Sequence, residues 1–328
     1  RFMVDQRGKS GQFILTGSAV PKDNVVQHTG TGRISRLLMR PMSLYESMES
    51  NGSVSLKALF DGETEIDNFS TLTIEQIAFA IVRGGWPASI GESEKIALRH
   101  AIDYVEAIIN ADVSRVDGIE KNPVRVRALL RSLSRNISTL ATIRTIHDDI
   151  AMGDADESIS EKTISQYLGA LDRIFVTENL PAWNPALRSK TAIRTSPKRQ
   201  FVDPSIAAAV MRLTPSRLLE DFNYFGFLFE SLCDRDLRIY AEAIDGQVFH
   251  YRDGSGLEAD AVIALNDGRW AAVEVKLGSK EIEDAAVHLL ELKNKVNTEK
   301  MREPSFLMIL TGTEIAYRRE DGGYVVPL

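Results

Sequence analysis

Three acidic residues and one lysine in the last third of the sequence have the types and spacing of a metal-dependent hydrolytic site. Asp260 and Glu274 lie in two short apolar runs, and Glu230 lies in a predicted helix before them. Residues two apart in a strand share a face, so Glu274 and Lys276 point the same way. Carboxylates suit Mg²⁺, and a lysine beside the ion can orient or polarise an attacking water. We therefore predict Mg²⁺ ligands at Glu230, Asp260 and Glu274, and a catalytic group of Asp260, Glu274 and Lys276.

A second interpretation of the same residues needs no metal. Charged side chains on an exposed strand face are ordinary, and these residues would then be solvated surface charges. A site is favoured because Glu274-Val275-Lys276 stands inside one apolar strand and Asp260 inside another. Both interpretations stay open at this stage.

The elements that must position these residues form an α/β block over 201–328. A short helix is expected after Phe201-Val202-Asp203-Pro204. The apolar periodicity then predicts a helix near 220–238, strands near 239–244, 247–252, 257–265 and 270–276, a helix near 280–298, and strands near 305–310 and 323–327.

The block over 113–200 predicts three helices and a two-stranded wing, which is a winged helix-turn-helix. Asn122-Pro123 is a good N-cap and first-turn pair for the first helix. The second helix is expected near 141–151, and the third after a capping-box pattern from Ser158 to Glu161. Strand-like stretches near 174–183 and 191–202 complete the pattern. The apolar face of the third helix consists of Ile164, Tyr167, Leu168 and Leu171.

Basic and polar residues on this block predict a nucleic-acid-binding surface. Arg127, Arg131 and Arg135 recur every four residues and share the face opposite the apolar stripe of their helix. Such a face can contact phosphates. Lys162 and Gln166 on the third helix have side chains that read base edges. The alternatives are a protein-binding winged helix or a solvated arginine face.

The overall charge excludes a protein held to nucleic acid by bulk electrostatics. The 328 residues carry 39 Lys and Arg against 46 Asp and Glu, a net charge of −7. Positive charge is concentrated locally instead. Residues 121–147 contain six Lys or Arg and no acid, and residues 179–202 contain five and no acid.

Cysteine, histidine and apolar content exclude other classes. One Cys and five scattered His argue against a disulfide scaffold, a Cys-based zinc finger and a His-rich metal site. No apolar run approaches the ~18–20 residues needed to cross a bilayer, and no signal peptide opens the chain. We expect a cytoplasmic protein with no membrane association.

The first third of the chain predicts helices separated by a sharp turn. Helices are expected near 43–50, 73–83 and 92–110, with Gly84-Gly85-Trp86-Pro87 as a helix stop. Gln12 to Gly17 is strand-like and ends on Thr16-Gly17-Ser18, and a second apolar-alternating stretch spans 34–39.

The whole chain resembles AAA-type ATPases of unknown function, found widely in bacteria and archaea, that carry a C-terminal domain with a PD-(D/E)xK nuclease-like core. The nuclease-like part of the resemblance is Asp260, thirteen intervening residues and Glu274-Val275-Lys276, with Glu230 on a preceding helix. Ala259 stands where the motif name has Pro. The other segments are residues 12–18, 32–46, 84–87 and 201–204.

This resemblance implies an α/β multidomain protein. It divides the chain into a remnant of the ATPase core over 1–50, a helical lid over 51–112, the winged helix over 113–200 and the nuclease-like domain over 201–328. The family's P-loop and Walker B strand would precede Gln12, so we expect ATP to bind only in an intact longer protein. The weak nucleotide-contact candidates in this chain are Thr16, Ser18 and Arg33.

The leading functional hypothesis is nucleic-acid handling with a Mg²⁺-dependent phosphodiesterase site. The alternative is a non-catalytic interaction or regulatory module on a nuclease-like scaffold, since fold does not imply function. The expected partners are a nucleic acid and either a second copy of the chain or another protein.

Overall fold

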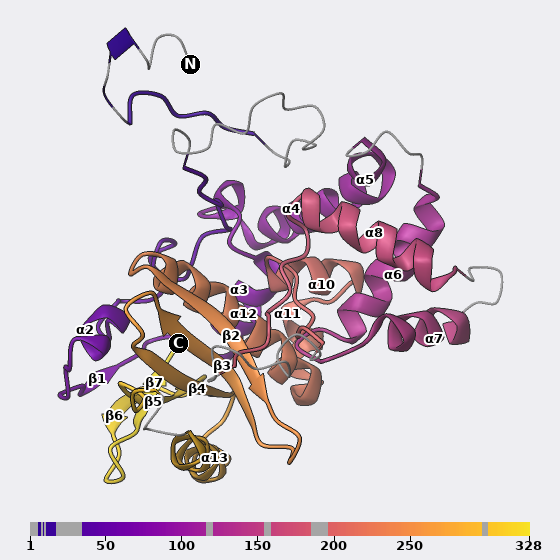
Figure 1. The fold of residues 1–328 in the computed structure, drawn as a ribbon. Helices are drawn as coiled ribbons and strands as arrows, with labels where there is room; N and C mark the ends of the chain where they lie inside the picture. Colours follow the sequence, from indigo (N-terminus) through magenta and orange to yellow (C-terminus); the bar gives the residue numbers. More distant parts are fainter. Residues whose placement is uncertain are drawn as a thin grey trace.

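A seven-stranded mixed sheet with helices around it forms the C-terminal half of the protein, which confirms the α/β class. The computed structural model describes residues 6–7, 9, 11–17, 35–115, 121–153, 159–184, 196–296 and 301–328. The strand order in the sheet is β1-β6-β7-β5-β4-β3-β2. Figure 1 shows the sheet in orange and yellow below the mainly helical part of the chain.

The centre of the sheet is an antiparallel meander followed by a parallel crossover. Strands β2 (Gly246–Arg252), β3 (Glu258–Leu265) and β4 (Trp270–Lys276) pair antiparallel in chain order. Helix α13 (Ile282–Lys295) then carries the chain to β5 (Leu307–Thr311), which is parallel to β4. The far side of the sheet is completed by β7 (Tyr324–Pro327), β6 (Ile315–Arg318) and the two-residue β1 (Asn68–Phe69).

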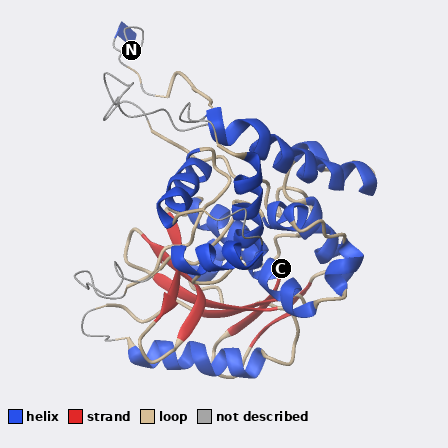
Figure 2. Cartoon of the chain, turned by 90° about the vertical axis from the view of Figure 1, so that its right-hand side faces the viewer, coloured by secondary structure: helices blue, strands red, loops and turns tan. Residues whose placement is uncertain are grey.

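Helices cover both faces of this sheet. Figure 2 shows the strands between one helix on one side and a group of helices on the other. Ala271, Val273 and Val275 of β4 join the large core that includes α12 (Phe222–Glu242), whereas Trp270 and Ala272 join a second core with α13. Strand β4 is therefore buried on both faces up to its last residue.

Most predicted elements of this half form, with three differences. Helix α12 continues to Glu242, so the strand expected near 239–244 is wrong. Leu237 and Ala241 are buried four residues apart, which is helical spacing. Strands β6 and β1 were not predicted, because they are four and two residues long and lack a clear alternation.

Most of the helical part precedes strands β2 to β7 in the chain. Helices α3 (Ile74–Arg83) and α4 (Glu94–Ala107) flank the predicted Gly84–Pro87 turn, and a π-helical turn (Ile108–Asp112) ends α4. The remaining helices are α2 (Leu56–Phe60), the 3-10 turn Pro87–Ser89, α5 (Val113–Arg115), α6 (Pro123–Arg135), α7 (Ile143–Gly153), α8 (Glu161–Arg173), α10 (Pro204–Val210) and α11 (Pro215–Leu219). Among the described residues, no helix has the length and apolar character to traverse a bilayer.

The three helices of the predicted winged helix are present, followed by two extended segments. The Asn122 side chain caps α6 by accepting from the Val124 N–H, as expected. Helix α8 is capped by Ser160, where the pattern suggested Ser158, which lies outside the described residues. Single bridges pair Thr177 with Phe201 and Leu180 with Lys198 in antiparallel fashion. The separate helices are therefore present, but their arrangement as a winged helix-turn-helix is not confirmed, and residues 191–195 of the second expected strand lie outside the described residues.

The predicted N-terminal strands do not form in the described part of the chain. Residues 12–17 and 35–40 are irregular, and Ile14, Leu15, Leu37 and Met39 are exposed. A strand needs a neighbour to pair its backbone groups, and the sheet begins only at β1. The helix expected near 43–50 is a turn over 44–48.

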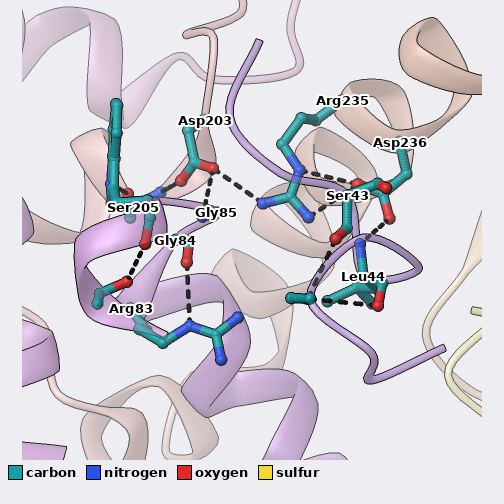
Figure 3. A network of polar contacts seen from close by, with 12 residues as sticks. Ser43, Leu44, Arg83, Gly84, Gly85, Asp203, Ser205, Arg235 and Asp236 are labelled. Carbon is teal, nitrogen blue, oxygen red and sulfur yellow. Dashed lines mark hydrogen bonds and ion pairs between the residues drawn. The ribbon is translucent and has the colours of Figure 1, made fainter. Parts of the chain in front are cut away.

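A buried polar network joins four segments that are distant in the sequence (Figure 3). The Arg235 guanidinium of α12 donates to Asp203 at 2.8 Å and to Asp236 at 2.8 Å. Asp203 in turn accepts from the Gly85 N–H at 2.9 Å, and Asp236 accepts from the Leu44 N–H at 2.9 Å. The 84–86 turn, the start of α10, α12 and the 44–48 turn are therefore tied to one guanidinium.

Glycine is required at position 85 of this network by close backbone approach. The Met42 N–H donates to the Gly85 carbonyl at 2.7 Å, and a Cβ on Gly85 would lie 2.1 Å from the Met42 carbonyl oxygen. A larger residue here would push the 44–48 turn away from Asp236.

We predict that Arg235→Met strongly destabilises the protein. The side chains of Arg235 and Asp236 are 2% exposed and that of Asp203 is fully buried, so the substitution leaves two uncompensated carboxylates. Breaking a buried pair costs about 3–5 kcal/mol, and the melting temperature should fall by roughly 10 °C. Thermal unfolding followed by circular dichroism measures the change.

Arg99→Ala is the matched control, because Arg99 pairs with Asp103 on the surface of α4. Exposed pairs contribute little, so its melting temperature should match that of the parent. Equal melting temperatures for the Arg235→Met variant and the parent would show that the network does not hold the fold together.

Candidate functional site

The four residues predicted to form a site come together at one end of β3 and β4. The Lys276 Nζ lies 2.7 Å from a Glu274 oxygen and 3.4 Å from Asp260 Oδ2. Asp260 Oδ2 also accepts from the Val275 N–H at 2.8 Å. The backbone pairing between β3 and β4 ends at Ala261 opposite Val273. Beyond this pair, the Asp260 side chain links the two strands. Asp260 is thereby held rigidly between the two strands.

A second lysine, which sequence reasoning did not assign to the site, lies at its centre. The Lys198 Nζ is 2.5 Å from Glu230 Oε1, 3.0 Å from the Asp260 carbonyl oxygen and 3.7 Å from Asp260 Oδ1. Its side chain is 9% exposed. Glu230 on α12 and Asp260 on β3 are therefore bridged by the Lys198 ammonium. The only sequence signal for Lys198 was its place in the second acid-free basic stretch.

Lys198 reaches the site from the two extended segments that follow α8. It pairs with Leu180 through two backbone hydrogen bonds of 2.9 Å. The first extended segment also runs along β2, where the Trp183 N–H donates to the His250 carbonyl and the His250 N–H donates to the Pro181 carbonyl. These contacts fix the backbone from which Lys198 projects.

The site is buried, which argues against the alternative of an exposed strand face. The Glu274 side chain is 4% exposed, because the face of β4 on which it lies is also the face that Trp270 and Ala272 pack against α13. Asp260 and Lys276 are 18% and 24% exposed. The interpretation of these four residues as solvated surface charges is wrong for this reason.

The donor chemistry of the site suits a hard cation, although its arrangement is not that of a formed metal centre. Carboxylate oxygens are the ligands of Mg²⁺, and the Lys198 ammonium between Glu230 and Asp260 shows that this position already attracts a positive charge. Within the described ranges, no group of three or more His, Cys, Asp or Glu side chains stands about a common metal position. Glu230, Asp260 and Glu274 would hold the ion only after Lys198 moved.

Burial and the neighbouring charges change the pKa values of the three acids in different directions. Burial and the neighbouring Asp260 carboxylate together raise the pKa of Glu274 to about 8, against the opposing Lys276. Burial also raises the pKa of Glu230 to about 8, with Lys198 opposing. Burial acts the same way on Asp260, but Lys198 and Lys276 outweigh it and lower its pKa. Asp260 is thus the carboxylate that stays ionised, whereas Glu230 and Glu274 both have raised pKa values that favour a proton.

Several buried polar atoms beside the site have no hydrogen-bond partner. They include Gln200 Oε1, Ser231 Oγ, Asp234 Oδ1 and His250 Nε2. Burial and the Lys198 charge lower the pKa of His250 to about 4, so this imidazole is neutral at neutral pH. Burial raises the pKa of Asp234 to about 6, and its Oδ2 accepts from Gln200 at 2.7 Å. The polar surroundings therefore extend along α12 from Glu230 to Asp234.

The residues predicted to bind nucleic acid are exposed on the helical part. Arg127, Arg131 and Arg135 of α6 face solvent, as do Lys162 and Gln166 of α8. Two of the arginines have acidic partners: Arg127 forms a two-point ion pair with Glu106, and Arg135 lies 3.2 Å from Asp149.

The nucleotide-contact candidates do not form a site in the described residues. Thr16 is exposed on the irregular segment 12–17, while Ser18 and Arg33 lie outside the described residues. Arg40, in the same basic segment as Arg33, forms ion pairs with Glu178 and Glu242.

Comparison with known proteins found similarity to two families of unknown function, each over less than half of the chain. Residues 74–217 match the family described as Domain of unknown function (DUF8612), and residues 225–328 match Domain of unknown function (DUF4143). The second domain is often found in AAA-ATPase-associated proteins. No curated protein and no solved structure matches the chain. Lys198 lies in the first match, whereas Glu230, Asp260, Glu274 and Lys276 lie in the second.

We predict that Glu274→Gln flattens the pH dependence of stability. The pKa of Glu274 is raised in the folded state, so its stabilising proton is fully present below the ordinary value of about 4.5 and is lost as pH rises through about 8. The free energy of unfolding should therefore decrease between these limits. A glutamine mimics the protonated acid and removes this part of the decrease, which urea titrations across the range would measure.

Glu258→Gln serves as the control, because Glu258 begins the same strand as Asp260 but its side chain is 49% exposed and pairs with Arg252. A Glu274→Gln variant whose pH profile coincides with that of the parent would contradict the protonated state assigned to Glu274.

We predict that replacing Arg127, Arg131 and Arg135 together by Ala reduces the salt dependence of DNA binding. Each lost phosphate contact lowers the log–log slope by about 0.9, so the maximum reduction is about 2.7. The ion pairs of Arg127 and Arg135 oppose phosphate contact, so Arg131→Ala alone should account for the largest share. Fluorescence anisotropy with duplex DNA over a range of salt concentrations tests this.

An Arg99→Ala variant should keep the parent slope, since Arg99 lies on α4, outside the proposed surface. An unchanged slope in the triple variant would remove this face of α6 from any interface with DNA.

Proposed function

We propose that this chain handles nucleic acid and that its C-terminal domain contains a Mg²⁺-dependent phosphodiesterase site of the nuclease-like kind. The proposal is carried by the convergence of Asp260, Glu274 and Lys276, with Glu230 beside them, in one buried cluster. The match of residues 225–328 to a domain associated with AAA-type ATPases supports a place for this chain in a longer ATPase-like protein.

In this proposal Glu230, Asp260 and Glu274 hold the ion. Bound Mg²⁺ supplies Lewis-acid activation of a phosphoryl group and of water. Asp260 is fixed by the Val275 N–H and remains ionised, so it provides a permanent negative charge at the end of β3. Glu274 releases its proton when positive charge enters, because burial and Asp260 are what raised its pKa.

Lys276 acts on water or phosphate at the rim of the cluster. Its ammonium contacts both Asp260 and Glu274, and its side chain is the most exposed of the three. The pKa of Lys276 is raised, since its two carboxylate neighbours outweigh burial, so it remains a cation. A cation at this rim orients an attacking water or draws in an anionic phosphodiester.

The helical part would bring nucleic acid to this site. Helices α6 and α8 present Arg131, Lys162 and Gln166 to solvent, and Leu180, which follows α8, pairs through its backbone with Lys198 of the acidic cluster.

A second candidate function is a non-catalytic interaction or regulatory module on the same scaffold. The observation that favours it is Lys198, which supplies a positive charge between Glu230 and Asp260 without any metal. In this case the cluster is a structural ion network and nucleic acid or protein binding is the whole function.

We predict that the protein cleaves DNA or RNA in Mg²⁺ or Mn²⁺, and that Asp260→Ala and Lys276→Ala each abolish cleavage. Lys276→Ala should lower the rate by at least about 100-fold with little loss of metal affinity, because a preorganised charged donor at the reacting group contributes about that much. Labelled single-stranded, duplex and RNA substrates, each with and without EDTA, measure the activity.

Glu258→Ala controls for the loss of a carboxylate from β3 and should cleave at the parent rate, since Glu258 is exposed and contacts Arg252. Absence of cleavage by the parent on every substrate, together with a higher melting temperature for Asp260→Ala than for the parent, would favour the non-catalytic candidate.

A further inference from the structure

The ammonium of Lys198 stands where a cation bound by Glu230 and Asp260 would stand. It contacts one oxygen of Glu230 and two oxygens of Asp260, which come from different elements. Both carboxylates are largely buried, with 14% and 18% of their side chains exposed. An acidic pair in such surroundings needs a positive charge, and the protein supplies its own.

The two lysines of the cluster differ in what they contact. Lys276 lies on the same strand as Glu274 and contacts Glu274 and the Oδ2 atom of Asp260. Lys198 comes from outside the sheet and contacts Glu230 and the Oδ1 side of Asp260. A divalent ion bridging Glu230 and Asp260 would therefore coincide with Lys198, whereas Lys276 stands between Asp260 and Glu274, the third acid of the proposed site.

We propose that Lys198 and a divalent cation compete for this one position, so that Lys198 is an internal cation that must leave before metal binds. The inference rests on the proposed function, because it concerns the same site.

Lys198 comes from a segment outside the sheet, so a movement of that segment would change the competition between Lys198 and the metal. Lys198 belongs to the part of the chain matched by the first family. Its backbone is hydrogen-bonded to Leu180 of the first extended segment, which runs along β2. The carboxylates belong to the second domain. A shift of the paired segments would withdraw the ammonium and leave the acids in place.

The experiment compares metal affinity among lysine variants of the full chain in the absence of nucleic acid. Mn²⁺ is titrated by calorimetry into the parent, Lys198→Met and Lys276→Met, and melting temperatures are recorded with and without the ion. Each Met variant removes one positive charge from the same cluster. The proposal expects at least about tenfold tighter Mn²⁺ binding in Lys198→Met than in Lys276→Met, because only the former opens the shared position.

Two further variants protect the test against loss of folding. Lys198→Gln keeps a hydrogen-bond donor for Glu230 without a charge and should gain affinity as Lys198→Met does. Lys198→Arg keeps the charge and should bind Mn²⁺ as weakly as the parent. Equal gains in the Lys198 and Lys276 variants would show an effect of net charge alone and overturn the proposal, as would the absence of any gain in both Lys198→Met and Lys198→Gln.

Cleavage assays on the same proteins separate this inference from the proposed function. Tighter Mn²⁺ binding by Lys198→Met, with no cleavage by the parent or the variant, would leave the inference standing and refute the phosphodiesterase. A parent that cleaves, together with a Lys198→Met variant that has lost cleavage at saturating Mn²⁺, would make Lys198 part of the reaction and overturn its role as a competitor.

Discussion

The buried guanidinium of Arg235 is the interaction on which the arrangement of this chain depends. Taking a guanidinium out of water is costly unless its donors are used, and Arg235 meets that cost with Asp203 and Asp236. Asp203 Oδ2 accepts from both Arg235 and the Gly85 N–H, whereas Asp236 accepts from Arg235 with one oxygen and from the Leu44 N–H with the other. Because Arg235 and Glu230 lie five residues apart on α12, the same helix fixes the acidic site relative to the helical part.

The acidic site depends on Asp260 in a comparable way. One oxygen atom of its carboxylate is held by the Val275 N–H and contacts Lys276, while the other faces Lys198. The residue therefore belongs to two ion clusters at once, one on β4 and one shared with α12. A side chain with this many fixed contacts loses little conformational freedom when a ligand arrives, which is the condition for a preorganised site.

The sequence could predict those residues of the site whose positions follow from the apolar periodicity of a single helix or strand. It could not predict residues whose positions depend on pairing between segments that are distant in the sequence. Alternation along β3 and β4 placed Asp260, Glu274 and Lys276 on neighbouring strands, and helical period placed Glu230 on α12. Lys198 could not be found in this way, because its place is set by bridges between segments with no strong periodicity. The end of α12 was missed for the opposite reason: residues 239–244 have strand-like composition, but the packing of Leu237 and Ala241 extends the helix.

Both edges of the sheet limit how this protein can join others. At one edge the chain from Pro181 to Trp183 occupies backbone groups of β2 at His250, and at the other edge β1 is only two residues long. Exposed strand edges are the usual templates for recruiting an extended peptide or a second sheet. A partner of the described part of this chain is therefore expected to recognise helix surfaces, and aggregation by strand addition is disfavoured from the outset.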